Sequence, residues 1–302
     1  MMALGALFFS IMAALVKLAG QTLPTMEVVL ARSLVTGGLS YAVLARRGIS
    51  IRGREPRLLV ARGVLGFFAL SCFYFAVIRL PLADATVIQY TNPIFTALIA
   101  AVTLKEMLRR SEIILTVASL GGVLLVARPS FLFGGEGAGL DPLGVTAALC
   151  GAVFSASAYV MVRRLRREEP MVVVFWFGLM SILMSLPFLA HGSTRLPVGW
   201  EWLILLGVGF STHFGQIFLT RGLQLESAGR ATAVGYLQIL FAAVWGLLLF
   251  GERPDAWTGA GALLIVGCTW LLTRTRKVTP TVAPGGGPPT PGEPEPPPMR
   301  PA

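Results

Sequence analysis

The chain has 302 residues, of which 55% are hydrophobic and 13% are charged. Soluble domains carry about 25% charged residues, so this chain could not cover a water-facing surface, whereas an apolar exterior is favourable in a bilayer. The composition excludes a compact water-soluble protein, and 25 Lys and Arg against 15 Asp and Glu leave a net charge of +10.

Ten segments are long and apolar enough to cross a membrane, which takes about 20 residues per helix. They are predicted over residues 3–19, 27–45, 61–79, 83–104, 113–129, 141–162, 171–190, 201–220, 230–251 and 256–273. No basic region precedes the first apolar run and no cleavage site follows it, so we interpret it as a retained helix rather than a signal peptide. The sequence predicts an all-α polytopic membrane protein with ten transmembrane helices.

Lys and Arg are concentrated in the connections that follow the even-numbered spans. These are residues 46–57, 105–112, 163–169, 221–230 and 274–277. The connections after odd-numbered spans carry one basic residue each: Lys17, Arg79, Arg128, Arg195 and Arg253. Basic connections stay on the cytoplasmic side. We therefore expect a cell-membrane protein with both termini cytoplasmic, whose positive charge reflects topology and not binding to nucleic acid.

The C-terminal segment 276–302 differs from the rest of the chain. Residues 280–302 contain ten of the 20 prolines, mixed with glycines. Such a composition cannot bury enough apolar surface to order itself. We expect a disordered cytoplasmic tail, and a proline-rich ligand for a partner domain is the alternative.

The sequence repeats itself at a constant offset of 146 residues, which aligns all ten spans. Matched pairs include Pro24 with Pro170, Tyr90 with Tyr236, and Glu106 with Glu252. We place the two repeats at residues 1–135 and 136–275. Because each holds five helices, an odd number, the second must be inverted relative to the first. Inverted repeats are typical of alternating-access carriers, whose substrate site lies near the midplane.

Two segments of the first repeat resemble a known family. LADATVIQYTNPIFTALIAAVTLKE (82–106) and GGVLLVARPSFLFGG (121–135) are similar to the EamA-type carriers of the drug/metabolite transporter superfamily, and in particular to the G branch of solute-carrier family 35. The resemblance implies a ten-helix bundle with a central cavity and secondary transport of a small polar metabolite. It does not fix the substrate. The second repeat has Gln238 and Ile239 where the first has Asn92 and Pro93, so roles are not carried from one half to the other.

Two arginines within predicted spans are the main candidates for binding substrate. A charge at the centre of a membrane helix costs about 2.5–3.5 kcal/mol on insertion scales, so Arg32 and Arg62 mark a candidate site. Guanidinium groups bind carboxylate and phosphate through paired hydrogen bonds, which predicts an anionic substrate. The alternatives are that Arg32 pairs with Glu27, and that Arg62 extends to the lipid headgroups.

Helix four offers further candidates around its proline. Pro93 removes a backbone hydrogen bond, and a broken helix at the midplane is a favoured place for a ligand. The candidates, with their counterparts in helix nine and polar residues of helices three, seven and eight, are Gln89, Tyr90, Asn92, Tyr236, Gln238, Tyr74, Trp176, His213 and Gln216. For each the alternative is ordinary packing or a satisfied hydrogen bond.

Acidic residues lie at the edges of the predicted spans. Glu106 and Glu252 occupy matched positions, where they could tie helix ends to arginine or backbone groups, or could act as gates. Glu27 is the one acid predicted farther inside. A proton-driven carrier usually needs a titratable group within the membrane. We therefore favour facilitated export or exchange over a proton relay.

Other classes of function have less support in the sequence. No GxxxxGK[ST] loop is present for an ATP-driven pump. Two histidines, His191 and His213, and three scattered cysteines give little material for an enzyme or a metal site. We expect no cofactor and no enzymatic activity, and keep a membrane enzyme, a channel and a non-transporting scaffold as alternatives. The expected partners are the bilayer and a small molecule, with a homodimer left open.

Overall fold

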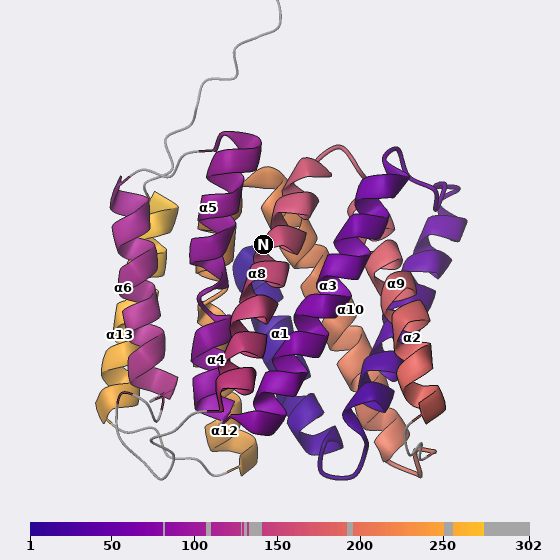
Figure 1. Ribbon diagram of the computed structural model, residues 1–302, viewed down its shortest axis with the longest axis horizontal. Helices are drawn as coiled ribbons and strands as arrows, with labels where there is room; N and C mark the ends of the chain where they lie inside the picture. The colour runs from indigo at the N-terminus through magenta and orange to yellow at the C-terminus, as the bar shows by residue number, and fades with distance from the viewer. Residues whose placement is uncertain are drawn as a thin grey trace, which may run out of the picture.

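The computed structural model describes residues 1–80, 82–106, 110–127, 129, 132, 141–191, 196–250 and 256–274. Within these ranges the chain is helical and contains no strand (Figure 1). The helices are α1 Met2–Ala19, α2 Thr25–Arg46, α3 Pro56–Arg79, α4 Leu82–Gln89, α5 Asn92–Leu104, α6 Arg110–Ala127, α8 Pro142–Arg164, α9 Pro170–His191, α10 Glu201–Leu225, α11 Ala228–Val234, α12 Leu237–Phe250 and α13 Ala256–Arg274. The expected tail 276–302 and Glu252 lie outside the described residues.

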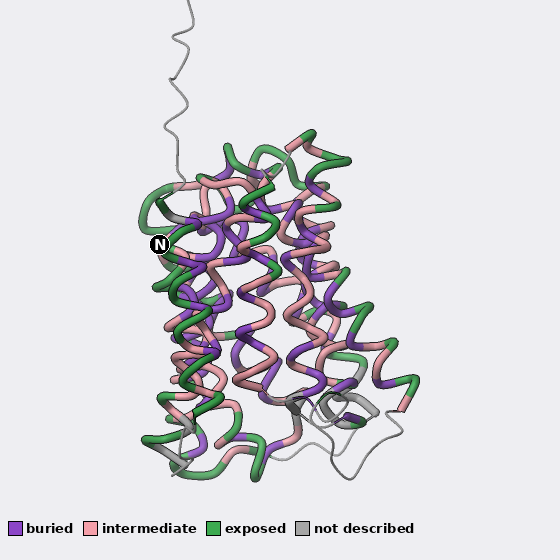
Figure 2. Tube along the Cα trace, turned by 90° about the vertical axis from the view of Figure 1, so that its left-hand side faces the viewer, coloured by how far each residue is buried: buried purple, intermediate pink, exposed green. Residues whose placement is uncertain are grey.

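The described helices make ten crossings, because α4 with α5 forms one crossing and α11 with α12 forms another. By length and apolar composition, eight of the crossings qualify as membrane spans in the described part of the chain, and Ala256–Leu272 is a shorter apolar helix. Large apolar side chains such as Leu98, Leu203 and Leu263 are exposed on the outside. Buried positions follow the inside of the bundle (Figure 2). An apolar exterior around a buried interior is what a bilayer favours.

The most extensive helix contacts have counterparts, each formed by the two helices that lie 146 residues away in the chain. α3 packs along α8 as α10 packs along α1, and α5 meets α8 as α12 meets α1. α2 packs against its own counterpart α9, and α6 against its own counterpart α13. Since four crossings lie between α1 and α8, an even number, the two helices run in opposite directions (Figure 1). The fold is two inverted five-helix repeats.

One end of the bundle collects most of the basic residues, and we call it the basic end. The helices α2, α5, α8 and α10 end there (Figure 1). α13 also runs toward this end, and α1 starts on the side nearer to it. Proline starts α3 and α8, where its missing N–H would have no helical partner. Asp141 caps α8 at the opposite end and pairs with Arg79 at 3.0 Å, which holds the pKa of Asp141 below its usual range.

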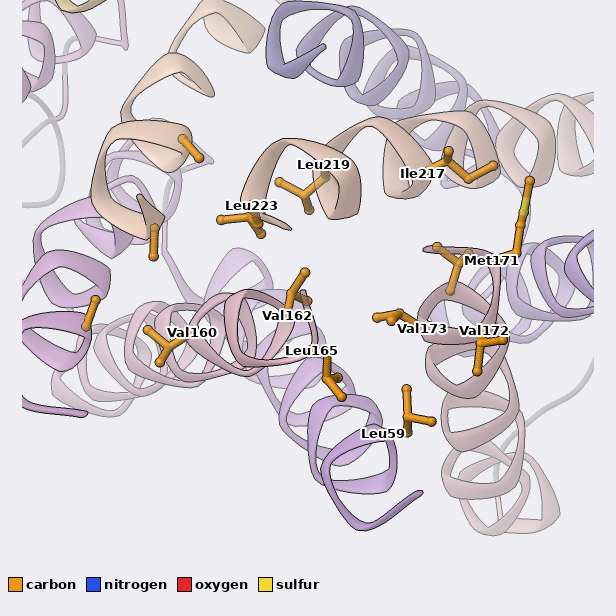
Figure 3. Close-up of a cluster of buried hydrophobic side chains, with 14 of the residues drawn as sticks. Leu59, Val160, Val162, Leu165, Met171, Val172, Val173, Ile217, Leu219 and Leu223 are labelled. Atoms are coloured by element: carbon orange, nitrogen blue, oxygen red, sulfur yellow. The ribbon is translucent and has the colours of Figure 1, made fainter. Parts of the chain in front are cut away.

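Two apolar clusters lie toward opposite ends of the bundle. The cluster toward the basic end joins both halves, and its side chains from α3, α8, α9 and α10 point into a common space (Figure 3). A smaller cluster between α1, α2 and α10 includes Ala19, Val28 and Leu205. These three lie 146 residues from Leu165, Val174 and Leu59 of the first cluster. The clusters are therefore counterparts under the repeat.

Both halves contain a broken helix at the same position. The first break separates α4 from α5 at Tyr90 and Thr91, two residues before Pro93. The second separates α11 from α12 at Gly235 and Tyr236. The sequence predicts a break only for helix four, because helix nine lacks the proline. Just after α11 the chain tightens without a proline, with the Gly235 amide donating to the Thr232 carbonyl at 2.9 Å and the Tyr236 amide to the Ala233 carbonyl at 3.2 Å.

Candidate functional site

Arg62 lies deeper in the bundle than the sequence predicts. α3 begins at Pro56 and not near residue 61, so Arg62 lies almost two turns inside the helix. It is 2% exposed, which is incompatible with a side chain extended to the lipid headgroups. Its Nη2 donates to Oε1 of Gln216 at 3.1 Å, and its Cζ lies 4.3 Å from the centroid of the Phe177 ring. Arg62 thus joins α3, α9 and α10.

Arg32 approaches the same aromatic ring from α2. It is 4% exposed, and its Cζ lies 5.9 Å from the Phe177 centroid. The ion pairs found among the described residues include neither Arg32 nor Arg62. Glu27 lies in the first turn of α2, at the helix edge and not farther inside. The two guanidinium groups share Phe177 as a cation–π partner, a contact that favours the charged form without neutralising it.

The arginines have hydrogen-bond donors that protein atoms do not satisfy. Within the described residues, Nε and Nη1 of Arg62 and Nε of Arg32 are buried without an acceptor. A buried polar group without a partner costs about 1–3 kcal/mol, and more when it is charged. Beside Arg32 is a narrow void with about 160 Å³ of unfilled space, too constricted for a water molecule. It is lined by Arg32, Ser33, Thr36, Phe177, Gly178 and Thr212. This void lies between α2, α9 and α10.

The broken helices meet at two tyrosines related by the repeat. Tyr90 and Tyr236 have ring centroids 5.8 Å apart, and the Tyr236 hydroxyl donates to the Tyr90 carbonyl at 3.0 Å. Gln89 bonds Ser155 of α8 through its Nε2 at 2.8 Å. Asn92 and Gln238 lie at the starts of α5 and α12, just after each break. The structure therefore brings Tyr90 and Tyr236 together at the junction of the halves, and no such contact joins Asn92 to Gln238 among the described residues.

Three other candidates have different surroundings. Trp176 donates to the Ile51 carbonyl at 2.8 Å and so holds the loop between α2 and α3. His213 lies 3.4 Å from the Ser40 hydroxyl, joining α10 to α2. Tyr74 lies on α3, within electrostatic range of Arg32. Trp176 belongs to the basic end, and His213 to a helix–helix contact.

Glu106 connects three helices at the basic end. Its Oε1 accepts from Nε of Arg163 at 2.6 Å, and its Oε2 accepts from the Ala228 amide at 3.1 Å. Arg163 also donates from Nη1 to the Gln224 carbonyl at 2.7 Å. Glu106 thus ties the end of α5 to the end of α8 and to the start of α11, where a carboxylate is also favoured by the helix dipole.

Sequence reasoning did not identify Phe177, Ser155 or Tyr159 as neighbours of the candidates. Phe177 lies in an apolar helix, where an aromatic residue is unremarkable, and Tyr159 lies within electrostatic range of Arg62. Gly66, one turn beyond Arg62 on the same face of α3, is one sequence feature that indicates a large neighbour packed against Arg62. A Cβ at Gly66 would lie close against Nη1 of Arg62 and 2.7 Å from the Phe177 ring. Glycine there leaves room for the guanidinium to lie over the ring.

The fold agrees with a comparison against known families. Residues 1–128 and 142–274 each match the EamA-like transporter family, and the chain belongs to that family. It is thus a multi-pass membrane transporter of the drug/metabolite transporter superfamily. A solved structure with 21% sequence identity covers 91% of this chain and 98% of its own at a TM-score of 0.77, which establishes the shared fold.

Two curated relatives are similar over much of the chain. The pseudopaline exporter CntI of Pseudomonas aeruginosa is 34% identical over 270 residues, covering 89% of this chain and 93% of the exporter. Solute carrier family 35 member G1 of Homo sapiens is 35% identical over 219 residues, covering 69% of this chain and 60% of the carrier. These similarities confirm the resemblance to the G branch of that solute-carrier family.

Proposed function

We propose that this protein exports a small anionic metabolite by alternating access, with Arg62 and Arg32 binding its anionic group. The observation that carries the proposal is the pair of buried arginines on Phe177, which have unsatisfied donors and no ion pair among the described residues. A carboxylate or phosphate on the substrate would supply the missing acceptors and offset the charge.

Alternating access is supported by how tightly the site is enclosed. The void beside Arg32 is too narrow for a metabolite, so a substrate could reach the arginines only when helices move apart. Inverted repeats supply such a motion, because one half can rock against the other around a fixed site. The two breaks, α4–α5 and α11–α12, are the positions at which the helices could bend.

The direction and the coupling are inferred from similarity and from the acids. One relative that matches most of both chains is named an exporter, which favours export here. The basic end would face the cytoplasm, with both termini on that side. Glu27 and Glu106 both lie at span edges, and Glu106 is engaged by Arg163, which favours export or exchange without a carboxylate proton relay.

The experiment compares metabolites retained and exported by cells that lack the protein or produce it as wild type, Arg62→Gln or Arg62→Lys. We expect an anionic compound to move from cells to medium with the wild type. Loss of a charge-assisted hydrogen bond of about 1.5–3 kcal/mol predicts that Arg62→Gln exports roughly ten- to a hundredfold more slowly. Arg62→Lys keeps the charge without the forked geometry and should retain part of the rate.

Arg79→Gln is the matched control, because Arg79 is an exposed arginine of the same helix paired with Asp141. It should export like the wild type, and export should persist when an uncoupler collapses the proton gradient. Export by Arg62→Gln at the wild-type rate, or export of a neutral or cationic compound alone, would refute the anion site.

A further inference from the structure

A second, larger cavity opens at the basic end. Its volume is about 690 Å³, which is within the range of pockets that hold small ligands. It is separate from the narrow void beside Arg32, and no residue lines both. The lining residues are Arg54, Glu55, Pro56, Arg57, Leu58, Leu104, Glu106, Arg163, Arg164 and Arg166.

The lining of this cavity is strongly positive. Five arginines face two glutamates around it. Glu106 is already engaged, since both of its oxygens accept hydrogen bonds from Arg163 and the Ala228 amide. Among the described residues, ion pairs are found for Arg163 but not for Arg57, Arg164 or Arg166. Three guanidinium groups are thus left with their donors available.

The convergence of these arginines is produced by the fold. Arg57 lies in the first turn of α3, Arg164 is the last residue of α8, and Arg166 lies in the turn that follows. Arg57 and Arg164, 107 positions apart in the chain, therefore face one cavity. Basic residues that only set the topology of the chain would not need to converge in this way. Like charges brought together repel unless an anion compensates them.

We infer that this cavity is a second anion-binding site, which takes a phosphate or carboxylate group on Arg57, Arg164 and Arg166. Guanidinium groups from two segments can hold the oxygens of one such group from different sides. The group can come from a soluble anion or from the headgroup of an anionic lipid, because the cavity lies at the end of the bundle. The inference does not depend on what the protein transports.

Pyrophosphate is the probe for the soluble source. The full-length protein is held in phosphatidylcholine nanodiscs, and binding is measured as a shift of thermal unfolding against sodium chloride of equal ionic strength. The triple variant Arg57→Gln, Arg164→Gln, Arg166→Gln is compared with the wild type. We expect pyrophosphate to stabilise the wild type, and its Kd to rise about tenfold or more in the triple variant.

The matched control removes the same amount of charge from the same end. Arg46, Arg52 and Arg167 are exposed arginines of the basic end that do not line the cavity, and Arg167 is the neighbour of Arg166. Replacing these three by Gln should leave the Kd within about twofold of wild type, because only the overall potential changes.

Nanodiscs containing phosphatidylglycerol form the lipid arm. If the headgroup is the source, phosphatidylglycerol stabilises the wild type and the control, fails to stabilise the cavity triple variant, and weakens pyrophosphate binding by competition. Stabilisation by pyrophosphate alone assigns the soluble source. Stabilisation by neither probe, or equal losses in the two triple variants, would overturn the inference. None of these outcomes changes with the rate of export, so the site and the proposed function can fail separately.

Discussion

Tyr236 supports the broken helix of the opposite half with a single hydroxyl group. It is 0% exposed, and its hydroxyl donates to the Tyr90 carbonyl, which the break leaves without its helical partner. The two residues are 146 positions apart, so this hydrogen bond crosses the junction of the repeats between matched positions. The interaction is asymmetric, because the tyrosine of the second half serves the backbone of the first.

Replacement of Tyr236 by Phe tests this contribution. The Tyr90 carbonyl would lose its partner in an apolar interior, which costs about 1–3 kcal/mol. We expect a lower midpoint of thermal unfolding in detergent. Tyr41→Phe is the control, since Tyr41 is exposed on α2, and it should unfold at the wild-type temperature. Equal midpoints for Tyr236→Phe and the wild type would show that the hydroxyl contributes nothing.

At the scale of helices, the close contact between α6 and α13 depends on glycine. A Cβ on Gly261 would lie 2.6 Å from the Gly122 carbonyl oxygen, and one on Gly122 would lie 2.9 Å from the Gly261 carbonyl oxygen. Backbone atoms cannot move aside as a flexible side chain can. The two helices approach at these positions because neither residue has a side chain.

Gly261→Ala and Gly259→Ala form a matched pair on α13. At Gly259 a Cβ would meet nothing within 4 Å, so alanine should be neutral or stabilise the helix by up to about 1 kcal/mol. At Gly261 the same change forces α6 and α13 apart, with an expected cost of about 1–3 kcal/mol. The unfolding midpoint in detergent should fall for Gly261→Ala and should stay unchanged or rise for Gly259→Ala. Matching shifts for both variants would contradict the close contact.

Helix positions could be predicted from the sequence, but some helix ends and one break could not. The run of arginines before α3 predicts a helix start at residue 61. The helix in fact starts at Pro56, and this earlier start places Arg62 almost two turns inside it. Pro93 signals the break in helix four by its missing N–H. No such residue marks helix nine, where the break comes from turn hydrogen bonds at Gly235 and Tyr236.

The candidate site could be predicted in part. A charge in an apolar span is conspicuous, so Arg32 and Arg62 could be found from the sequence, and structure places both at Phe177. Phe177 itself could not be chosen among 18 phenylalanines by residue type. Trp176 is predicted as a candidate because it is a polar aromatic residue in a span, but its indole N–H donates to the loop at the basic end.

At the scale of the whole molecule, the two apolar clusters are a symmetric pair, which the proposed alternating access would use as barriers. Leu165, toward the basic end, and Ala19, toward the opposite end, are matched positions and are both buried. The Glu106 contacts to Arg163 and Ala228 fasten the basic end. If the halves rock around a central site, opening one barrier must close the other.

Glu106→Gln weakens the fastening at the basic end, because an amide has one acceptor oxygen and cannot satisfy both donors. In a background without Cys72, Cys150 and Cys268, single cysteines at Leu165 and Ala19 report the opening of each barrier through their rate of reaction with a thiol reagent. Alternating access predicts that Glu106→Gln raises the rate at position 165 and lowers it at position 19. A rise at both positions, or no change at position 19, would contradict two inverted halves that open in turn.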